Sequence, residues 1–170
     1  MEDLRREIFE KVEEYFKKRG NDPRKKIGVA YPCFDHREVN QALDSLLDVW
    51  ISQGPKVRQF EKEYAEYIGT KFGIGCNSGS SANLLALTAL IQSGHLNPGD
   101  EVIVPAATFT TVISPLLQTG LVPVFVDIET QTYNNCPDAI ENAITEKTKL
   151  IMVVHSLGCP SKMDEIMAIS

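Results

Sequence analysis

Metal-ligating side chains are scarce in this sequence of 170 residues. It contains only three histidines, and its four cysteines are far apart and form no Cys-x-x-Cys pair (His36, His95, His155; Cys33, Cys76, Cys136, Cys159). A structural zinc site needs several such ligands at short spacings. We therefore expect no metal centre built within this chain, and we interpret the cysteines as reduced, unpaired thiols.

Long apolar runs and basic clusters are also missing. No apolar run reaches the roughly 18 residues that a membrane-spanning helix needs, and residues 1–6 are charged, unlike a secretion signal. The net charge is −6, and the longest basic run is the tripeptide 24–26. A nucleic-acid-binding face usually carries a basic patch, so we expect no nucleic acid partner, no membrane contact and a cytoplasmic location.

The second half of the chain contains alternating apolar strands and helices. Continuous apolar strands separated by helices are typical of a parallel sheet covered on both faces, and hence of a three-layer α/β/α fold. Pro115 is expected to kink its helix or confine it to its start. The predicted strands are 71–75, 101–105, 123–128 and 149–155, and the predicted helices are 82–92, 110–118, 137–145 and one that begins at Pro160.

The first half is predicted to be helical. Apolar residues recur at helical spacing over 2–19 and over 35–50, where Asp35 and Glu38 form a capping box. A third helix has Pro55 in its first turn and ends at Gly69. We interpret 1–34 as a helical extension with a linker and 35–170 as the main domain. Trp50 shares an apolar face, so a core position is favoured over a binding role.

A small polar cluster, Ser78-Gly79-Ser80-Ser81, lies where a predicted strand turns into an apolar helix. The first amide groups of a helix have no internal partner and lie at its positive end, so such a turn suits a phosphate. The plainer alternative is that Ser80 or Ser81 simply caps the helix. A Walker loop is excluded because no lysine is present, and a dinucleotide fingerprint lacks its third glycine, which disfavours a Rossmann dehydrogenase.

The position of this cluster favours the phosphate interpretation. In open α/β sheets, ligands gather beyond the carboxyl ends of the strands. The residues predicted at those ends are the serine cluster, Ala106-Ala107-Thr108-Phe109, Asp127 and His155-Ser156. A hydrogen-bonded position at the strand end is favoured for His155 over a place near a ligand.

Several motifs in order resemble one enzyme family over 39–170. They are Gly54-Pro55-x-Val57, Asn77-Ser78-Gly79-Ser80-Ser81-Ala82-Asn83, Pro98-Gly99-Asp100-Glu101-Val102-Ile103, Pro123-Val124-Phe125-Val126-Asp127 and His155-x-x-Gly158. The chain resembles the DegT/DnrJ/StrS-type sugar aminotransferases, which are pyridoxal-phosphate enzymes of fold type I. Within that family it is most similar to the CDP-4-keto-6-deoxyglucose 3-dehydrases, on Thr132-Tyr133-Asn134 and on the extra N-terminal helix among other features.

The resemblance implies the large domain of a fold type I transferase, incomplete and with an N-terminal helical extension. It implies pyridoxal 5'-phosphate or pyridoxamine 5'-phosphate as cofactor, with the phosphate held by Gly79, Ser80 and Ser81. Phe109 would stack on the pyridine ring, although core packing is an equally open interpretation of this residue. Gln53 and Gly54 would lie on the side of a nucleotide-sugar substrate, at the interface of a homodimer.

The resemblance places no catalytic residue in this chain. The acidic partner of the pyridine nitrogen and the catalytic lysine, or histidine in the 3-dehydrases, are expected beyond Ser170. The helix over 163–170 carries no stop signal, so we interpret the chain as truncated and expect negligible turnover from it alone.

The expected whole enzyme dehydrates or transaminates a nucleotide-linked 4-keto-6-deoxy sugar for cell-surface or secondary-metabolite sugars, including lipopolysaccharide. The alternative is a non-catalytic α/β module that binds a phosphoryl ligand. The enzyme interpretation predicts an exposed sheet edge and exposed apolar surface, whereas the module should be compact and monomeric.

Overall fold

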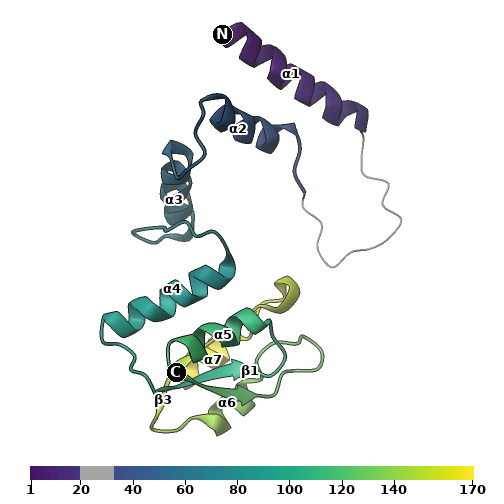
Figure 1. Cartoon of the computed structure of the whole chain (residues 1–170). Helices are drawn as coiled ribbons and strands as arrows, with labels where there is room; N and C mark the ends of the chain where they lie inside the picture. Colours follow the sequence, from purple (N-terminus) through teal and green to yellow (C-terminus); the bar gives the residue numbers. More distant parts are fainter. Residues whose placement is uncertain (20–32) are drawn as a thin grey trace. The chain divides into compact units, whose positions relative to one another are not determined.

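The computed structural model describes residues 1–19 and 33–170. These residues form seven α-helices, three strands and one short 3₁₀ turn. They divide into two compact units, Met1–Gly75 and Cys76–Ser170, and each is described by itself (Figure 1). The predicted domain boundary between residues 34 and 35 concerns the whole protein and stays a prediction.

The first unit consists of α1 (Glu2–Arg19), α2 (His36–Leu47) and α3 (Pro55–Ile68). The predicted capping box is confirmed. The Asp35 carboxylate accepts a hydrogen bond from the Arg37 amide at 2.7 Å, and the Glu38 carboxylate accepts one from the Asp35 amide at 2.8 Å. Gly69 ends α3 in the left-handed conformation with φ +79°, as predicted.

The second helix ends three residues before the predicted Trp50. Asp48 caps it, and the amide of Trp50 donates to the Ser45 carbonyl at 2.8 Å. Val49 adopts a left-handed backbone with φ +56°, which turns the chain away from the helix axis. Periodicity alone extended the helix too far because the apolar pattern continues through this turn.

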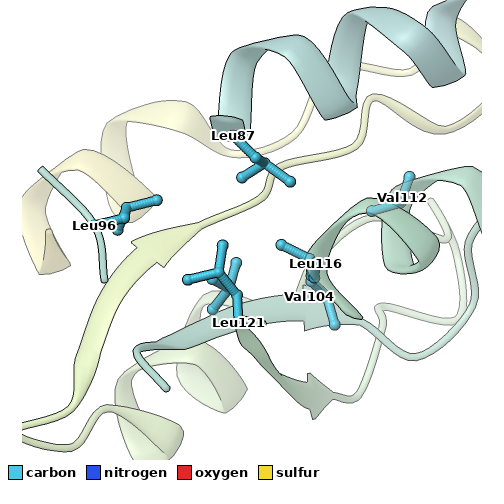
Figure 2. Close-up of a cluster of buried hydrophobic side chains, with 7 residues drawn as sticks. Leu87, Leu96, Val104, Val112, Leu116 and Leu121 are labelled. Atoms are coloured by element: carbon cyan, nitrogen blue, oxygen red, sulfur yellow. The ribbon is translucent and has the colours of Figure 1, made fainter. Parts of the chain in front are cut away.

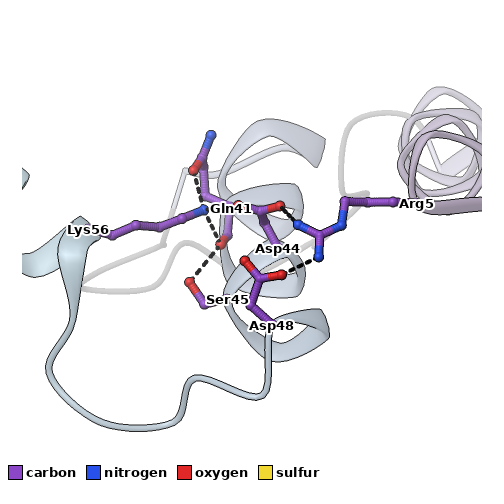
Figure 3. A network of polar contacts seen from close by, with 6 residues as sticks. All are labelled: Arg5, Gln41, Asp44, Ser45, Asp48 and Lys56. Carbon is purple, nitrogen blue, oxygen red and sulfur yellow. Dashed lines mark hydrogen bonds and ion pairs between the residues drawn. The ribbon is translucent and has the colours of Figure 1, made fainter. Parts of the chain in front are cut away.

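An ionic network holds the helices of the first unit together (Figure 3). The Arg5 guanidinium of α1 donates to Asp44 at 2.6 Å and also pairs with Asp48, and Lys56 of α3 lies 2.8 Å from Asp44. The hydrogen bond from Lys56 is the main reason why the pKa of Asp44 lies below its usual value. The side chains are partly exposed, so the network orients α1 and α3 on α2 more than it stabilises the unit.

The second unit is built on a parallel sheet, as predicted. Its strands are β1 (Glu101–Pro105), β2 (Val122–Val126) and β3 (Thr148–Ile151), in the order β2-β1-β3. The register of β1 and β2 runs without a shift, from Glu101 opposite Val122 to Pro105 opposite Val126. The helices are α4 (Gly79–Gln92), α5 (Thr110–Gln118), α6 (Pro137–Ala143) and α7 (Met163–Ile169), and the 3₁₀ turn is η1 (Ser156–Gly158).

The central strand supplies both cores of this unit, because successive side chains of a strand point to opposite faces. Val102 and Val104 are fully buried and pack with residues of α4, α5 and the adjoining turns (Leu87, Leu96, Val112, Leu116, Leu121; Figure 2). Ile103 faces the opposite side and packs with Val126, Ile140 of α6 and Ile166 of α7. The two cores confirm the predicted three layers, with β1 in the middle.

Two strand predictions need correction. Residues 71–75 form no strand, because none of the described strands pairs with them. The last strand was predicted over 149–155 but ends at Ile151. Beyond it, the Asn135 side chain replaces a strand partner, because its oxygen accepts from the Val154 amide at 3.3 Å.

Helix and strand ends differ by smaller amounts elsewhere. The second strand runs over Val122–Val126, not 123–128, and Ile128 forms an isolated bridge with Asn135. The predicted helix 137–145 ends at Ala143, and the last helix begins at Met163 after η1 instead of at Pro160. Helix α5 keeps its predicted bounds with Pro115 inside it.

Lys162 at the start of α7 is expected to make stability depend on pH. Its ammonium lies 2.7 Å from the Glu129 carboxylate, and this hydrogen bond lowers the pKa of Glu129. A carboxyl group with a depressed folded pKa stabilises the fold above its unfolded pKa of about 4.3, and this contribution is lost as the pH falls through the folded pKa. Lys162→Met should therefore be less stable than the unaltered chain at pH 7, and the two should converge in acid.

Urea unfolding between pH 7 and pH 3 measures this difference. Lys149→Met is the control, because Lys149 donates to the uncharged Glu146 carbonyl at 2.9 Å and its removal should shift stability little at any pH. A stability gap for Lys162→Met that stays constant across the whole pH range would contradict the assignment.

Candidate cofactor site

The serine cluster forms the first turn of α4, which begins at Gly79 and not at the predicted residue 82. Ser78 is the capping residue. Its hydroxyl accepts a hydrogen bond from the Ser81 amide at 3.2 Å, and its backbone is extended with φ −162°. The simple capping alternative named Ser80 or Ser81, so that assignment was wrong. Both residues lie inside the helix instead, at its second and third positions.

The first turn of α4 fits a phosphate in three respects. As the first helical residues, Gly79 and Ser80 have amide groups with no acceptor inside the helix. A side chain at Gly79 would meet no atom within 4 Å, so space is open above its backbone. The first turn of α4 contains no acidic residue, and an anion there would therefore meet no negative charge on this turn.

Phe109 occupies the cap position before α5 and is 82% exposed. Core packing was the alternative for this ring, and none of the described residues buries it. Helices α4 and α5 lie side by side, and the side-chain amide of Asn83 in α4 donates a hydrogen bond to the Thr111 carbonyl of α5 at 3.1 Å. The structure thus brings Gly79, Ser80, Ser81 and Phe109 together at the starts of two adjoining helices. Their roles toward the phosphate and the pyridine ring stay predictions.

The two predicted substrate residues lie in the first unit. Gly54 is buried and precedes α3, while the exposed Gln53 has its amide nitrogen 3.5 Å from Glu61. A hollow of about 390 Å³ opens beside Gly54 and is also lined by Trp50 and Lys56. Trp50 lies outside α2 and is 44% exposed, so the predicted core position is wrong.

Gly54 is expected to tolerate no side chain. A methyl group there would overlap the indole nitrogen of Trp50. Gly54→Ala should push the indole outward, shift its emission to longer wavelength and destabilise the fold by about 1–3 kcal/mol through overpacking. Trp50 is the single tryptophan, so its fluorescence reports this site alone. Ser52→Ala, at an exposed position lining the same hollow, is the control and should change neither quantity. An unchanged emission for Gly54→Ala would refute the contact.

His155 follows the third strand, and its Nδ1 atom accepts a hydrogen bond from the Ser161 amide at 3.1 Å. This confirms the hydrogen-bonded interpretation and places the ring proton of neutral His155 on Nε2. Two buried asparagines support the same loop. Asn134 belongs to the motif Thr132-Tyr133-Asn134, which gave it no structural role, and Asn135 was not singled out from the sequence. Asn134 accepts from the Ser156 amide at 2.8 Å and donates to the Cys159 carbonyl at 3.0 Å. The sequence did not indicate their burial, which leaves them only 2% and 1% exposed.

Within residues 1–19 and 33–170 of the protein, no group of three or more histidine, cysteine, aspartate or glutamate residues could hold a metal ion. None of the helices in the same ranges is both long enough and apolar enough to cross a bilayer.

Comparison with known proteins identifies one matching family. The model of the DegT/DnrJ/EryC1/StrS aminotransferase family matches residues 32–170. A dTDP-4-dehydro-2,6-dideoxy-D-glucose 3-dehydratase of Saccharopolyspora spinosa is 48% identical over 132 residues, which are 75% of this chain and 29% of that protein.

Two solved structures share the fold. An Escherichia coli GDP-4-keto-6-deoxy-D-mannose 3-dehydratase with bound hydrated pyridoxal phosphate has a TM-score of 0.78 at 38% identity, over 85% of this chain and 38% of its own. A sugar aminotransferase from Streptococcus pneumoniae, in the pyridoxamine-phosphate form, has a TM-score of 0.74 at 36% identity, over 84% of this chain and 35% of its own.

The family match over residues 32–170 includes the first turn of α4 and the start of α5. The chain spans little more than a third of the two solved proteins and under a third of the Saccharopolyspora enzyme. The predicted fold type I architecture and the predicted likeness to nucleotide-sugar 3-dehydrases are confirmed. This chain belongs to the DegT/DnrJ/EryC1/StrS aminotransferase family.

Proposed function

We propose that this chain carries the phosphate-binding part of an enzyme that uses pyridoxal or pyridoxamine 5'-phosphate. The observation that carries the proposal is the open first turn of α4, where Ser78 caps the helix and leaves the start of the turn available. Gly79, Ser80 and Ser81 would bind the phosphate through amide groups and hydroxyls. The exposed ring of Phe109 would cover one face of the pyridine.

The proposed reaction is 3-dehydration or transamination of a nucleotide-linked 4-keto-6-deoxy sugar. When bound, the cofactor supplies an electron sink, and the protein contributes binding and orientation. Gln53 and Gly54 are the substrate-side residues in this proposal. Family membership supports it, as do two relatives whose names state 3-dehydration of such sugars. A homodimer, a cytoplasmic location and a place in surface or secondary-metabolite sugar synthesis belong to the same proposal.

Titration of the chain with pyridoxamine 5'-phosphate tests the cofactor site directly. Amide hydrogen exchange measured with and without the compound should show protection at residues 79–82 and little change in α6 or α7. Protection confined to other residues, or no binding at millimolar concentration, would remove the proposal. Adenosine monophosphate is the matched control, because it carries a phosphate without a pyridine ring and should bind more weakly.

Large apolar side chains on the surface favour the enzyme interpretation over a free-standing binding module. Val122 and Phe125 of β2 are 45% and 55% exposed, and Phe60, Tyr64 and Tyr67 of α3 are at least half exposed. A self-contained module rarely leaves so many large side chains uncovered. Size-exclusion chromatography with thermal melting distinguishes the enzyme interpretation from the binding module. A sharp monomeric peak with cooperative melting would support the module. Sequencing onward in the reading frame would show whether a catalytic lysine or histidine follows.

A further inference from the structure

We propose that Asn83 is a positioning residue that fixes the phosphate-binding turn against Phe109. The inference rests on the proposed function, in which one cofactor contacts both the turn of α4 and Phe109. The link between α4 and α5 is a separate observation. Asn83 is the fifth residue of α4, one turn beyond Gly79. It reaches out of its own helix and donates to the Thr111 carbonyl in the first turn of α5 at 3.1 Å.

The Thr111 carbonyl is available because of Pro115. In an α-helix this oxygen would accept from the amide of the residue four positions later, which here is Pro115, and proline has no N–H. The proline ring also presses on that carbonyl and turns it away from the helix axis. A carbonyl that is partly buried and unsatisfied would cost free energy, and the Asn83 amide group removes that cost.

The bond joins the two segments that the cofactor would touch. Asn83 lies next to the turn formed by Gly79, Ser80 and Ser81, and Thr111 lies two residues after Phe109. A side-chain amide donating to a carbonyl has one chemically sensible orientation, since the carbonyl can only accept. Leu87 of α4 and Leu116 of α5 belong to the same apolar cluster, and apolar contacts have no preferred direction, whereas a hydrogen bond between defined atoms sets a distance. Asn83 therefore sets the spacing between a phosphate on α4 and a ring stacked on Phe109.

Binding of two ligands distinguishes a positioning role of Asn83 from a general role in stabilising the fold. Inorganic phosphate needs only the turn of α4, whereas pyridoxamine 5'-phosphate needs the turn and Phe109 at the right spacing. Asn83→Leu should leave the dissociation constant of inorganic phosphate within twofold and raise that of pyridoxamine 5'-phosphate by about tenfold. Asn142→Leu is the matched control, because its amide donates within α6 to the Asp138 carbonyl at 2.8 Å and should alter neither constant. Equal weakening of both ligands, or no change in either, would overturn the positioning role.

A double-mutant cycle tests the bond without any ligand. Pro115→Ala restores an N–H that can satisfy the Thr111 carbonyl inside α5, so Asn83→Leu should cost at most half as much stability in that background as in the unaltered chain. A full cost in both backgrounds would refute the bond to Thr111. If the cycle shows coupling but the unaltered chain binds neither ligand, the proposed function fails and Asn83 is only a structural brace between α4 and α5.

Discussion

Ser80→Asp is expected to abolish binding of pyridoxamine 5'-phosphate while leaving the fold at least as stable as before. The new carboxylate would lie at the second position of α4, where a negative charge interacts favourably with the helix dipole, by about 0.3–1 kcal/mol. The same charge would repel the phosphate and occupy the amide groups that should bind it. We expect the dissociation constant to rise more than about 100-fold, which is about 2.7 kcal/mol.

This test is specific because Ser80→Asp should weaken binding of pyridoxamine 5'-phosphate without lowering the stability of the fold. A variant that merely damaged the fold would lose both. Calorimetric titration measures the binding, and urea unfolding measures the stability. Ser93→Asp provides the control at the other end of the same helix, where Ser93 is the C-cap residue. There the charge opposes the dipole, so stability should fall while binding stays within twofold. Normal binding by Ser80→Asp would exclude this turn as the phosphate site.

Leu116→Ala should cause one of the largest losses of stability available in the second unit, about 2–5 kcal/mol in the free energy of unfolding. Leu116 is fully buried between α5 and the sheet, beside Val104 and Leu121 (Figure 2). Removing three carbon atoms there leaves a cavity in the layer that supports α5 and hence Phe109. The loss is measured by denaturant unfolding, with the slope checked for two-state behaviour.

The adjacent residue supplies the control. Leu117 is the same side chain on the same helix but is 63% exposed, so Leu117→Ala should change stability by no more than about 0.5 kcal/mol. Similar losses for the two variants would mean that α5 does not pack on the sheet through Leu116. A loss below 1 kcal/mol for Leu116→Ala alone would mean that the neighbouring side chains close the cavity.

Features that depend on neighbouring residues were predictable from the sequence. The capping box of Asp35 and Glu38, Pro55 at the start of α3 and Gly69 at its end are local devices, and each lies where the pattern predicts it. The parallel sheet also followed from local patterns, because fully buried strands have continuous apolar sequences. The start of α4 was placed three residues late, since its apolar pattern begins only after the serines and Gly79 concealed the true first turn.

Features that depend on distant residues were not predictable. Residues 71–75 have the composition of a strand, but a strand also requires a partner, and composition does not supply one. The exposure of Phe109 and of Trp50 depends on how loops fold around them, which periodicity does not describe. The bond from Asn83 to Thr111 spans two helices and depends on a proline in the second, so no single motif indicates it.

The order of the strands has a consequence for how the second unit forms. The middle strand, β1, comes first in the chain, and both outer strands are added to it later. Its pairing with β2 joins segments linked only by α5, whereas its pairing with β3 closes a much longer loop and carries a register shift between Glu101 and Val102. Closing the shorter loop costs less entropy. We therefore expect β1, α5 and β2 to associate first as the chain folds, and β3 to join this nucleus later.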